Sequence, residues 1–102
     1  MEIKEYLKQA KKYQKNPKRH RIDRLTYLTL GNAGESGEVA DEIKKAWRNK
    51  NGKITKGRRL KILQEMGDVM NIQLRMLKEL GCDMDELFVI HLEKLKNKEK
   101  PF

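Results

Sequence analysis

The sequence predicts an all-α protein: an antiparallel helical bundle of about four helices, completed by oligomerisation. Apolar residues recur every three or four positions in four segments, and no alternating β-branched run is present. Polar breaks separate the segments. Hydrophobic residues make up 37% of the 102 residues, against ~45–50% in average globular chains. One copy of the chain therefore has little core to bury, and we expect burial between copies to supplement it.

The first half of the chain is expected to form two helices. Apolar residues at helical spacing predict a helix over about residues 2–15, which ends before Asn16-Pro17. The second helix is expected over about 23–48. It ends at the polar stretch 49–57, which contains an Asn-Gly turn signal.

Two further helices are expected in the second half. The third, over about 58–80, carries two adjacent apolar stripes and must therefore be covered on two sides. Gly81 is a natural C-terminal cap for it. Asp83 is a candidate N-cap for the fourth helix, over about 84–98. We divide the single domain, residues 1–102, into an N-terminal helix and basic loop (1–22) and a helical core (23–98).

Charge and cysteine content limit the classes of function. Twenty-four basic and 15 acidic residues give a net charge of +9, which attracts anions such as nucleotides and nucleic acid. Cys82 is the single cysteine, so an intrachain disulfide and a cysteine-rich zinc site are excluded. Neither a membrane-spanning apolar run nor the apolar core of a signal peptide is present. We therefore expect a cytoplasmic protein that does not bind membranes.

Two acidic pairs, each at i and i+3, lie beside the apolar faces of the second and third helices. Glu35 and Glu38 form the first pair, and Glu65 and Asp68 form the second. At ~100° per residue, Glu35 borders its apolar face and Glu65 falls inside the apolar arc. If the helices pack antiparallel, four carboxylates converge, which is costly unless a cation neutralises them. Because hard divalent ions prefer oxygen ligands, we predict a Mg²⁺ site, with Mn²⁺ as a possible substitute.

The competing interpretation is that acidic pairs on a charge-rich helix are solvated surface. Glu42 is expected to be solvated, since the third helix has no acidic residue that would obviously pair with it at a metal site. Trp47 is expected to be core or interface. Gly31, Gly34 and Gly37 recur every three residues although each glycine costs ~1 kcal/mol inside a helix. Their spacing indicates that another backbone or a ligand approaches this helix closely.

Three segments resemble motifs of the MazG-like nucleotide pyrophosphohydrolases. Residues 34–45 (GESGEVADEIKK) resemble the family's GExGEvaDxiKK motif, and residues 65–69 (EMGDV) resemble its E(L/M)GDv motif. Residues 91–95 (HLEKL) are similar to its NxxKL element. The resemblance implies an all-α homodimer or homotetramer. It also implies Mg²⁺-dependent hydrolysis of a nucleoside or deoxynucleoside triphosphate to the monophosphate and pyrophosphate.

The resemblance also implies roles for individual residues. The metal ligands it implies are Glu35, Glu38, Glu65 and Asp68. Glu38 is further assigned the catalytic role of orienting the attacking water. His91, Lys94 and Lys98 are assigned to substrate binding. His91 stands where the family often has Asn, and Lys98 where Arg often follows. Residues 70–72 replace aromatic residues that frequently follow the acidic motif, which leaves the nucleobase preference open.

An alternative from another class is a basic helical module that binds nucleic acid without catalysis. It rests on the net charge of +9 and on the basic stretches 15–21 and 44–61. No motif for reading bases accompanies them. A third hypothesis is an oligomeric scaffold protein that has kept the fold and lost the catalytic activity.

Overall fold

The computed structural model describes residues 1–14, 20–49 and 52–99 of the chain. Every regular element in these ranges is helical, which confirms the all-α prediction. The elements are α1 (Ile3–Ala10), the 3₁₀ helix η1 (Lys11–Tyr13), α2 (Arg21–Arg48), α3 (Lys56–Glu79) and α4 (Met84–Glu99). The boundaries of α2, α3 and α4 agree with the predicted ones within about two residues.

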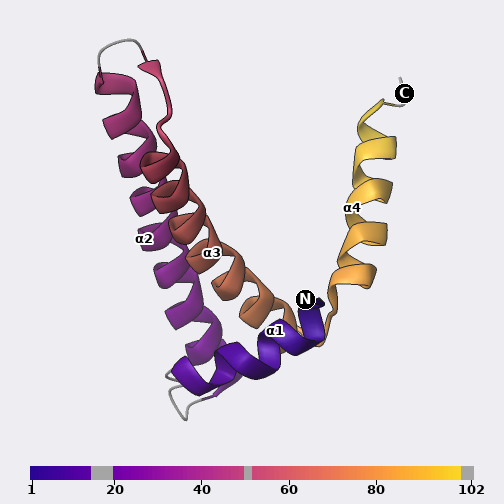
Figure 1. Cartoon of the computed structure of the whole chain (residues 1–102). Helices are drawn as coiled ribbons and strands as arrows, with labels where there is room; N and C mark the ends of the chain where they lie inside the picture. Colours follow the sequence, from indigo (N-terminus) through magenta and orange to yellow (C-terminus); the bar gives the residue numbers. More distant parts are fainter. Residues whose placement is uncertain (15–19, 50–51, 100–102) are drawn as a thin grey trace.

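Helices α2 and α3 form a long antiparallel pair, which is the main packed unit of the chain (Figure 1). The short connection between them forces the antiparallel direction. Thr55 starts α3 by accepting a hydrogen bond from the backbone N–H of Arg58 at 3.1 Å, which satisfies one of the free donors at the helix start.

Each helix of the pair turns one stripe with alternating three- and four-residue spacing toward the other, and we call these two stripes the hairpin seam. On α2 the seam consists of Leu25, Leu28, Asn32, Glu35, Val39, Glu42 and Ala46, all buried or half-buried. On α3 it consists of Arg58, Ile62, Glu65, Val69, Ile72, Met76 and Glu79, all half-buried. The average spacing of 3.5 residues is that of helices packed along their length. Polar residues therefore occupy several positions of a seam that is otherwise apolar.

The N-terminal segment is shorter than predicted. Helix α1 ends at Ala10, tightens into η1, and Gln14 adopts an extended backbone. This departure from the predicted helix over 2–15 allows the side chain of Gln14 to donate to Asn71 Oδ1 on α3 at 2.7 Å. Helix α1 lies across the end of the hairpin where α2 begins and α3 ends (Figure 1). Residues 15–19 of the expected basic loop lie outside the described residues.

Two caps separate α3 from α4, as the sequence predicts. Gly81 has φ 67°, a left-handed conformation that suits glycine. Its N–H donates to the carbonyl of Lys78 at 3.1 Å, and the N–H of Cys82 donates to Leu77 at 2.9 Å, the paired pattern of a Schellman motif. Asp83 then accepts from the N–H of Glu86 at 2.8 Å and starts α4. The chain turns sharply here, and α4 leaves the hairpin (Figure 1).

The single chain is open rather than a closed four-helix bundle. Its radius of gyration is 16.9 Å, against about 13 Å for a compact domain of this length. Among the described residues, the buried apolar side chains are Leu28, Ala46 and Leu74, each still 4–5% exposed. Trp47 is 78% exposed, so it is not part of the core of one chain. The expected bundle is thus realised within one chain only by α2 and α3, because α4 does not fold back onto them.

Candidate metal centre

Three carboxylates from two helices meet near the middle of the hairpin. Glu35 of α2 and Glu65 and Asp68 of α3 each offer an oxygen within 4.8 Å of the others. Glu35 and Glu65 are half-buried and Asp68 is exposed. The antiparallel seam causes this meeting, because it places Glu35 opposite Glu65 and Asp68 lies one turn further along the same side of α3. The convergence expected from the two sequence motifs is therefore present for these three residues.

The crowding of the carboxylates affects the pKa of Glu65. Burial raises the pKa of the Glu65 carboxyl, and the neighbouring charges of Asp68, Glu38 and Glu35 raise it further. Both causes disfavour the charged form of Glu65 when nothing neutralises the cluster. A divalent cation would reverse this effect by pairing with the carboxylates.

Glu38 lies at the edge of the cluster. It is exposed and is not one of the three residues whose oxygens lie within 4.8 Å of one another. Its charge nevertheless reaches Glu65 and raises the pKa of that carboxyl. Glu38 thus lies beside the three converging acids, on the solvent side, and its assignment as a fourth metal ligand stays a prediction.

The donor set fits magnesium. Mg²⁺ takes oxygen ligands at about 2.0–2.1 Å, so two ligands on one ion lie no more than about 4.2 Å apart. The three carboxylate oxygens, all within 4.8 Å of each other, would reach this spacing by small side-chain rotations. The same ion commonly keeps open positions for water and phosphate oxygens.

Asn32 occupies the seam position one turn before Glu35. Its Oδ1 atom is buried and has no hydrogen-bond partner among the described residues. A buried carbonyl oxygen without a partner is unfavourable, and an ordered water is the usual partner for such an atom. Asn32 is not among the predicted site residues, although its place in the seam between Leu28 and Glu35 marks it as a polar residue on an apolar stripe.

A cavity of about 620 Å³ opens beside the acid cluster. Its lining comes from η1 and the residue after it, from α2 and from α3: Tyr13, Gln14, Tyr27, Leu28, Leu30, Gly31, Glu35, Asp68, Asn71, Ile72 and Arg75. Glu35 and Asp68 belong to both the cavity and the cluster. The volume lies in the range of small-molecule sites, about 300–1,000 Å³. The cavity was not predicted from the sequence, because Tyr13 and Gln14 in its wall fall within the helix predicted over about residues 2–15.

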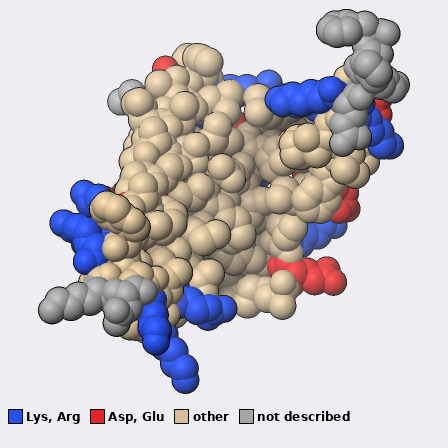
Figure 2. Space-filling model, turned by 90° about the horizontal axis from the view of Figure 1, so that it is seen from above, with Lys and Arg blue, Asp and Glu red and all other residues tan. Residues whose placement is uncertain are grey.

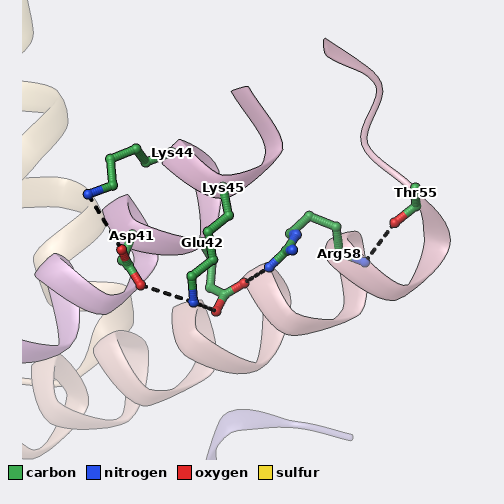
Figure 3. Close-up of polar contacts among 6 residues, drawn as sticks. All are labelled: Asp41, Glu42, Lys44, Lys45, Thr55 and Arg58. Carbon is green, nitrogen blue, oxygen red and sulfur yellow. Dashed lines mark hydrogen bonds and ion pairs between the residues drawn. The ribbon is translucent and has the colours of Figure 1, made fainter. Parts of the chain in front are cut away.

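Glu42 contradicts the expectation that it is solvated. It is only 9% exposed, and its carboxylate accepts a hydrogen bond from the guanidinium of Arg58 on α3 (Figure 3). Lys45 lies 3.3 Å from its other oxygen. The bond from Arg58 lowers the pKa of Glu42. Pairing occupies Glu42 fully, so it belongs to the packing of the hairpin and not to the acid cluster.

The three predicted substrate-binding residues, His91, Lys94 and Lys98, are exposed on α4. Because α4 stands apart from the hairpin (Figure 1), one chain does not bring them to the acid cluster. His91 and Lys94 line a separate pocket made by α4 residues. Their assignment to substrate binding therefore stays a prediction.

Fold and site together define a helical-hairpin protein with a cluster of acidic side chains between its two long helices. No helix in the described ranges is long and apolar enough to cross a membrane. The chain is 35% identical over 78 residues to Gene 37 protein of Mycobacterium phage L5, a match that covers 76% of this chain and 68% of that protein. The chain therefore belongs to the same family as Gene 37 protein. No family model and no solved structure match the chain.

Proposed function

We propose that this protein is a MazG-like nucleotide pyrophosphohydrolase that uses Mg²⁺, or Mn²⁺ in its place, to hydrolyse a nucleoside or deoxynucleoside triphosphate to the monophosphate and pyrophosphate. The observation that carries the proposal is the meeting of Glu35, Glu65 and Asp68 from two helices, with oxygens within 4.8 Å of one another. The motif resemblance supplies the reaction type, and the adjoining cavity supplies room for a substrate.

The four acidic residues have two roles in the proposed reaction. Glu35, Glu65 and Asp68 would hold the cation, and magnesium supplies charge neutralisation and polarisation of phosphate oxygens. Glu38, exposed at the edge of the cluster, orients a water molecule and accepts its proton. The water oxygen forms a bond to the α-phosphorus. The bond from that phosphorus to the bridging oxygen breaks, and pyrophosphate leaves with the bonding electron pair.

The proposal includes a homodimer or homotetramer. One chain exposes 8931 Å², whereas a folded monomer of this mass exposes about 6,000 Å². The excess is of the size that large, permanent interfaces bury. Exposed apolar residues occur on α2, α3 and α4. The face seen in Figure 2 is largely uncharged at its centre, and charged side chains of both signs lie around its rim. A second copy would cover this surface, and its α4 could supply basic residues to the acid cluster.

The first experiment measures turnover and metal binding together. Purified protein is incubated with Mg²⁺ and each triphosphate, and products are separated by ion-exchange chromatography. We expect monophosphate and pyrophosphate from wild type. Glu65→Gln should lose both turnover and Mn²⁺ binding measured by calorimetry. Glu38→Gln should lose turnover and retain most of the metal affinity. Glu2→Gln, a change at an exposed acid outside the cluster, is the matched control and should behave as wild type.

Three results would contradict the proposal or part of it. Undiminished turnover in a Glu38→Gln, Asp68→Asn double variant would refute the site. Absence of turnover together with DNA binding that weakens steeply with salt would favour the nucleic-acid-binding alternative.

Sedimentation equilibrium tests the proposed oligomeric state, and a monomer at micromolar concentration would exclude the proposed dimer and tetramer.

A further inference from the structure

We propose that the cavity beside the acid cluster is the subsite for the nucleobase, with Tyr13 and Tyr27 contacting the base and the amide pair of Gln14 and Asn71 facing its edge. This inference rests on the proposed function for the identity of the ligand as a nucleotide. It adds the residues that would distinguish a nucleotide from an inorganic polyphosphate.

The first argument is position. Glu35 and Asp68 line the cavity and also belong to the cluster of three carboxylates. A ligand whose phosphates meet a cation held there therefore has the cavity directly available for the rest of the molecule. The remaining wall is mostly apolar and aromatic, with Leu28, Leu30 and Ile72 among its residues, and Arg75 also lies in it. Its apolar part suits a flat heterocycle.

The second argument is the exposure of the two tyrosines. Tyr13 is 88% exposed and Tyr27 is 52% exposed, yet both line the cavity. Neither ring is buried in the core of the chain, so the packing of one chain does not account for them. Stacking of a base on an aromatic side chain gives affinity without requiring a particular base. The two rings therefore offer the cavity a surface for a nucleobase.

The third argument is the chemistry of the amide pair. Gln14 Nε2 donates to Asn71 Oδ1 at 2.7 Å. This bond uses one donor and one acceptor, and the Gln14 carbonyl oxygen and the Asn71 amide nitrogen are left for a ligand. If both amides were turned over, the pair would still present one acceptor and one donor. Neighbouring donor and acceptor groups are what the pairing edge of every nucleobase requires.

The test compares a nucleoside triphosphate with inorganic tripolyphosphate, which has the phosphates and no base. For wild type and variants, the ratio of kcat/KM on the two substrates is measured with saturating Mg²⁺. Tyr13→Ala should lower this ratio about tenfold, mainly through a higher KM for the nucleotide. Asn71→Asp, which retains the acceptor for Gln14 and loses the donor, should change the ranking of the four bases. Tyr6→Leu is the matched control, because Tyr6 does not line the cavity. It should leave the ratio unchanged.

A binding measurement separates failure of the subsite from failure of the proposed reaction. Nucleoside monophosphates are titrated into metal-free protein, and the ring signals of the tyrosines and the side-chain amide signals of Gln14 and Asn71 are followed by NMR. Shifts confined to these signals, absent in Tyr13→Ala, support the subsite even if no triphosphate is hydrolysed. Turnover of triphosphates with an unchanged substrate ratio in Tyr13→Ala, or monophosphate binding that shifts other signals, would overturn the subsite and leave the hydrolase proposal standing.

Discussion

The space available for a side chain differs between Gly31 and Gly34. Replacing each glycine by alanine should therefore change the free energy of unfolding by a different amount. A Cβ atom added at Gly31 would lie 3.3 Å from Ile72 Cδ1 on the facing helix, whereas one added at Gly34 meets nothing within 4 Å. Both positions lie inside α2. Alanine there restricts the unfolded chain and stabilises by about 0.4–1 kcal/mol where space allows.

Gly34→Ala should therefore raise the free energy of unfolding by about 0.4–1 kcal/mol. Gly31→Ala should bring the same gain in stability, but the new methyl group pushes Cδ1 of Ile72 away from its preferred rotamer. That displacement costs about 0.5–1.5 kcal/mol. We expect the two effects nearly to cancel. Gly31→Ala should thus be less stable than Gly34→Ala by roughly the cost of moving Ile72, and about equal to wild type.

Urea denaturation followed by far-UV circular dichroism measures this difference, at one protein concentration because assembly would affect stability. A double-mutant cycle adds Ile72→Val, which removes the Cδ1 atom in the way. Gly31→Ala should be more favourable in the Ile72→Val background than in wild type. Equal stabilisation by Gly31→Ala and Gly34→Ala, with no coupling to Ile72, would refute the close approach of α2 and α3 at this point.

Three further predictions concern the packing and caps. Leu74→Ala removes a core side chain that is 5% exposed and should lower the free energy of unfolding by about 2–5 kcal/mol in urea titrations; a loss below 1 kcal/mol would contradict its burial. Arg58 lowers the pKa of Glu42 below its ordinary value of 4.5. The ion pair therefore stabilises the folded protein above pH 4.5, and this contribution is lost as the pH falls through the pKa of Glu42 in the folded state. Thermal melts from neutral to acid pH should therefore show a larger loss for wild type than for Glu42→Gln, and parallel losses would exclude the pair as a contributor. Gly81→Ala, at φ 67°, should destabilise by roughly 1–2 kcal/mol in chemical denaturation, whereas a neutral effect would argue against the left-handed cap.

Local signals in the sequence predicted much of the fold. The caps at Gly81 and Asp83 depend on residues close in the chain, and both are present in the structure. The same holds for α2 and α3, whose apolar periodicity extends over many turns. The extended backbone at Gln14 was not predictable in this way, because it accompanies a hydrogen bond to Asn71, 57 residues away.

The site shows the same division. The carboxylates of Glu35, Glu65 and Asp68 could be placed together from helical angles and an antiparallel direction alone. The burial of Glu42 could not, because its partner Arg58 is identified only when the alignment of α2 against α3 is known. The departure of α4 was also not predictable, since its apolar residues fit both a closed bundle and a surface covered by another copy.

The ion pairs near the two ends of the hairpin restrict how its helices can slide. Arg24 of α2 pairs with Glu79 of α3 at 2.7 Å near one end, and Glu42 of α2 pairs with Arg58 of α3 near the other. A slip by seven residues that keeps the seam would set Glu42 against Glu65 and drive Glu35 into Ile72. Alternative alignments thus bring like charges together or bury a lone carboxylate, both unfavourable. The seam residues that bring the acids together thus also disfavour other alignments of the hairpin. The spacing of the three carboxylates is therefore set when α2 packs against α3.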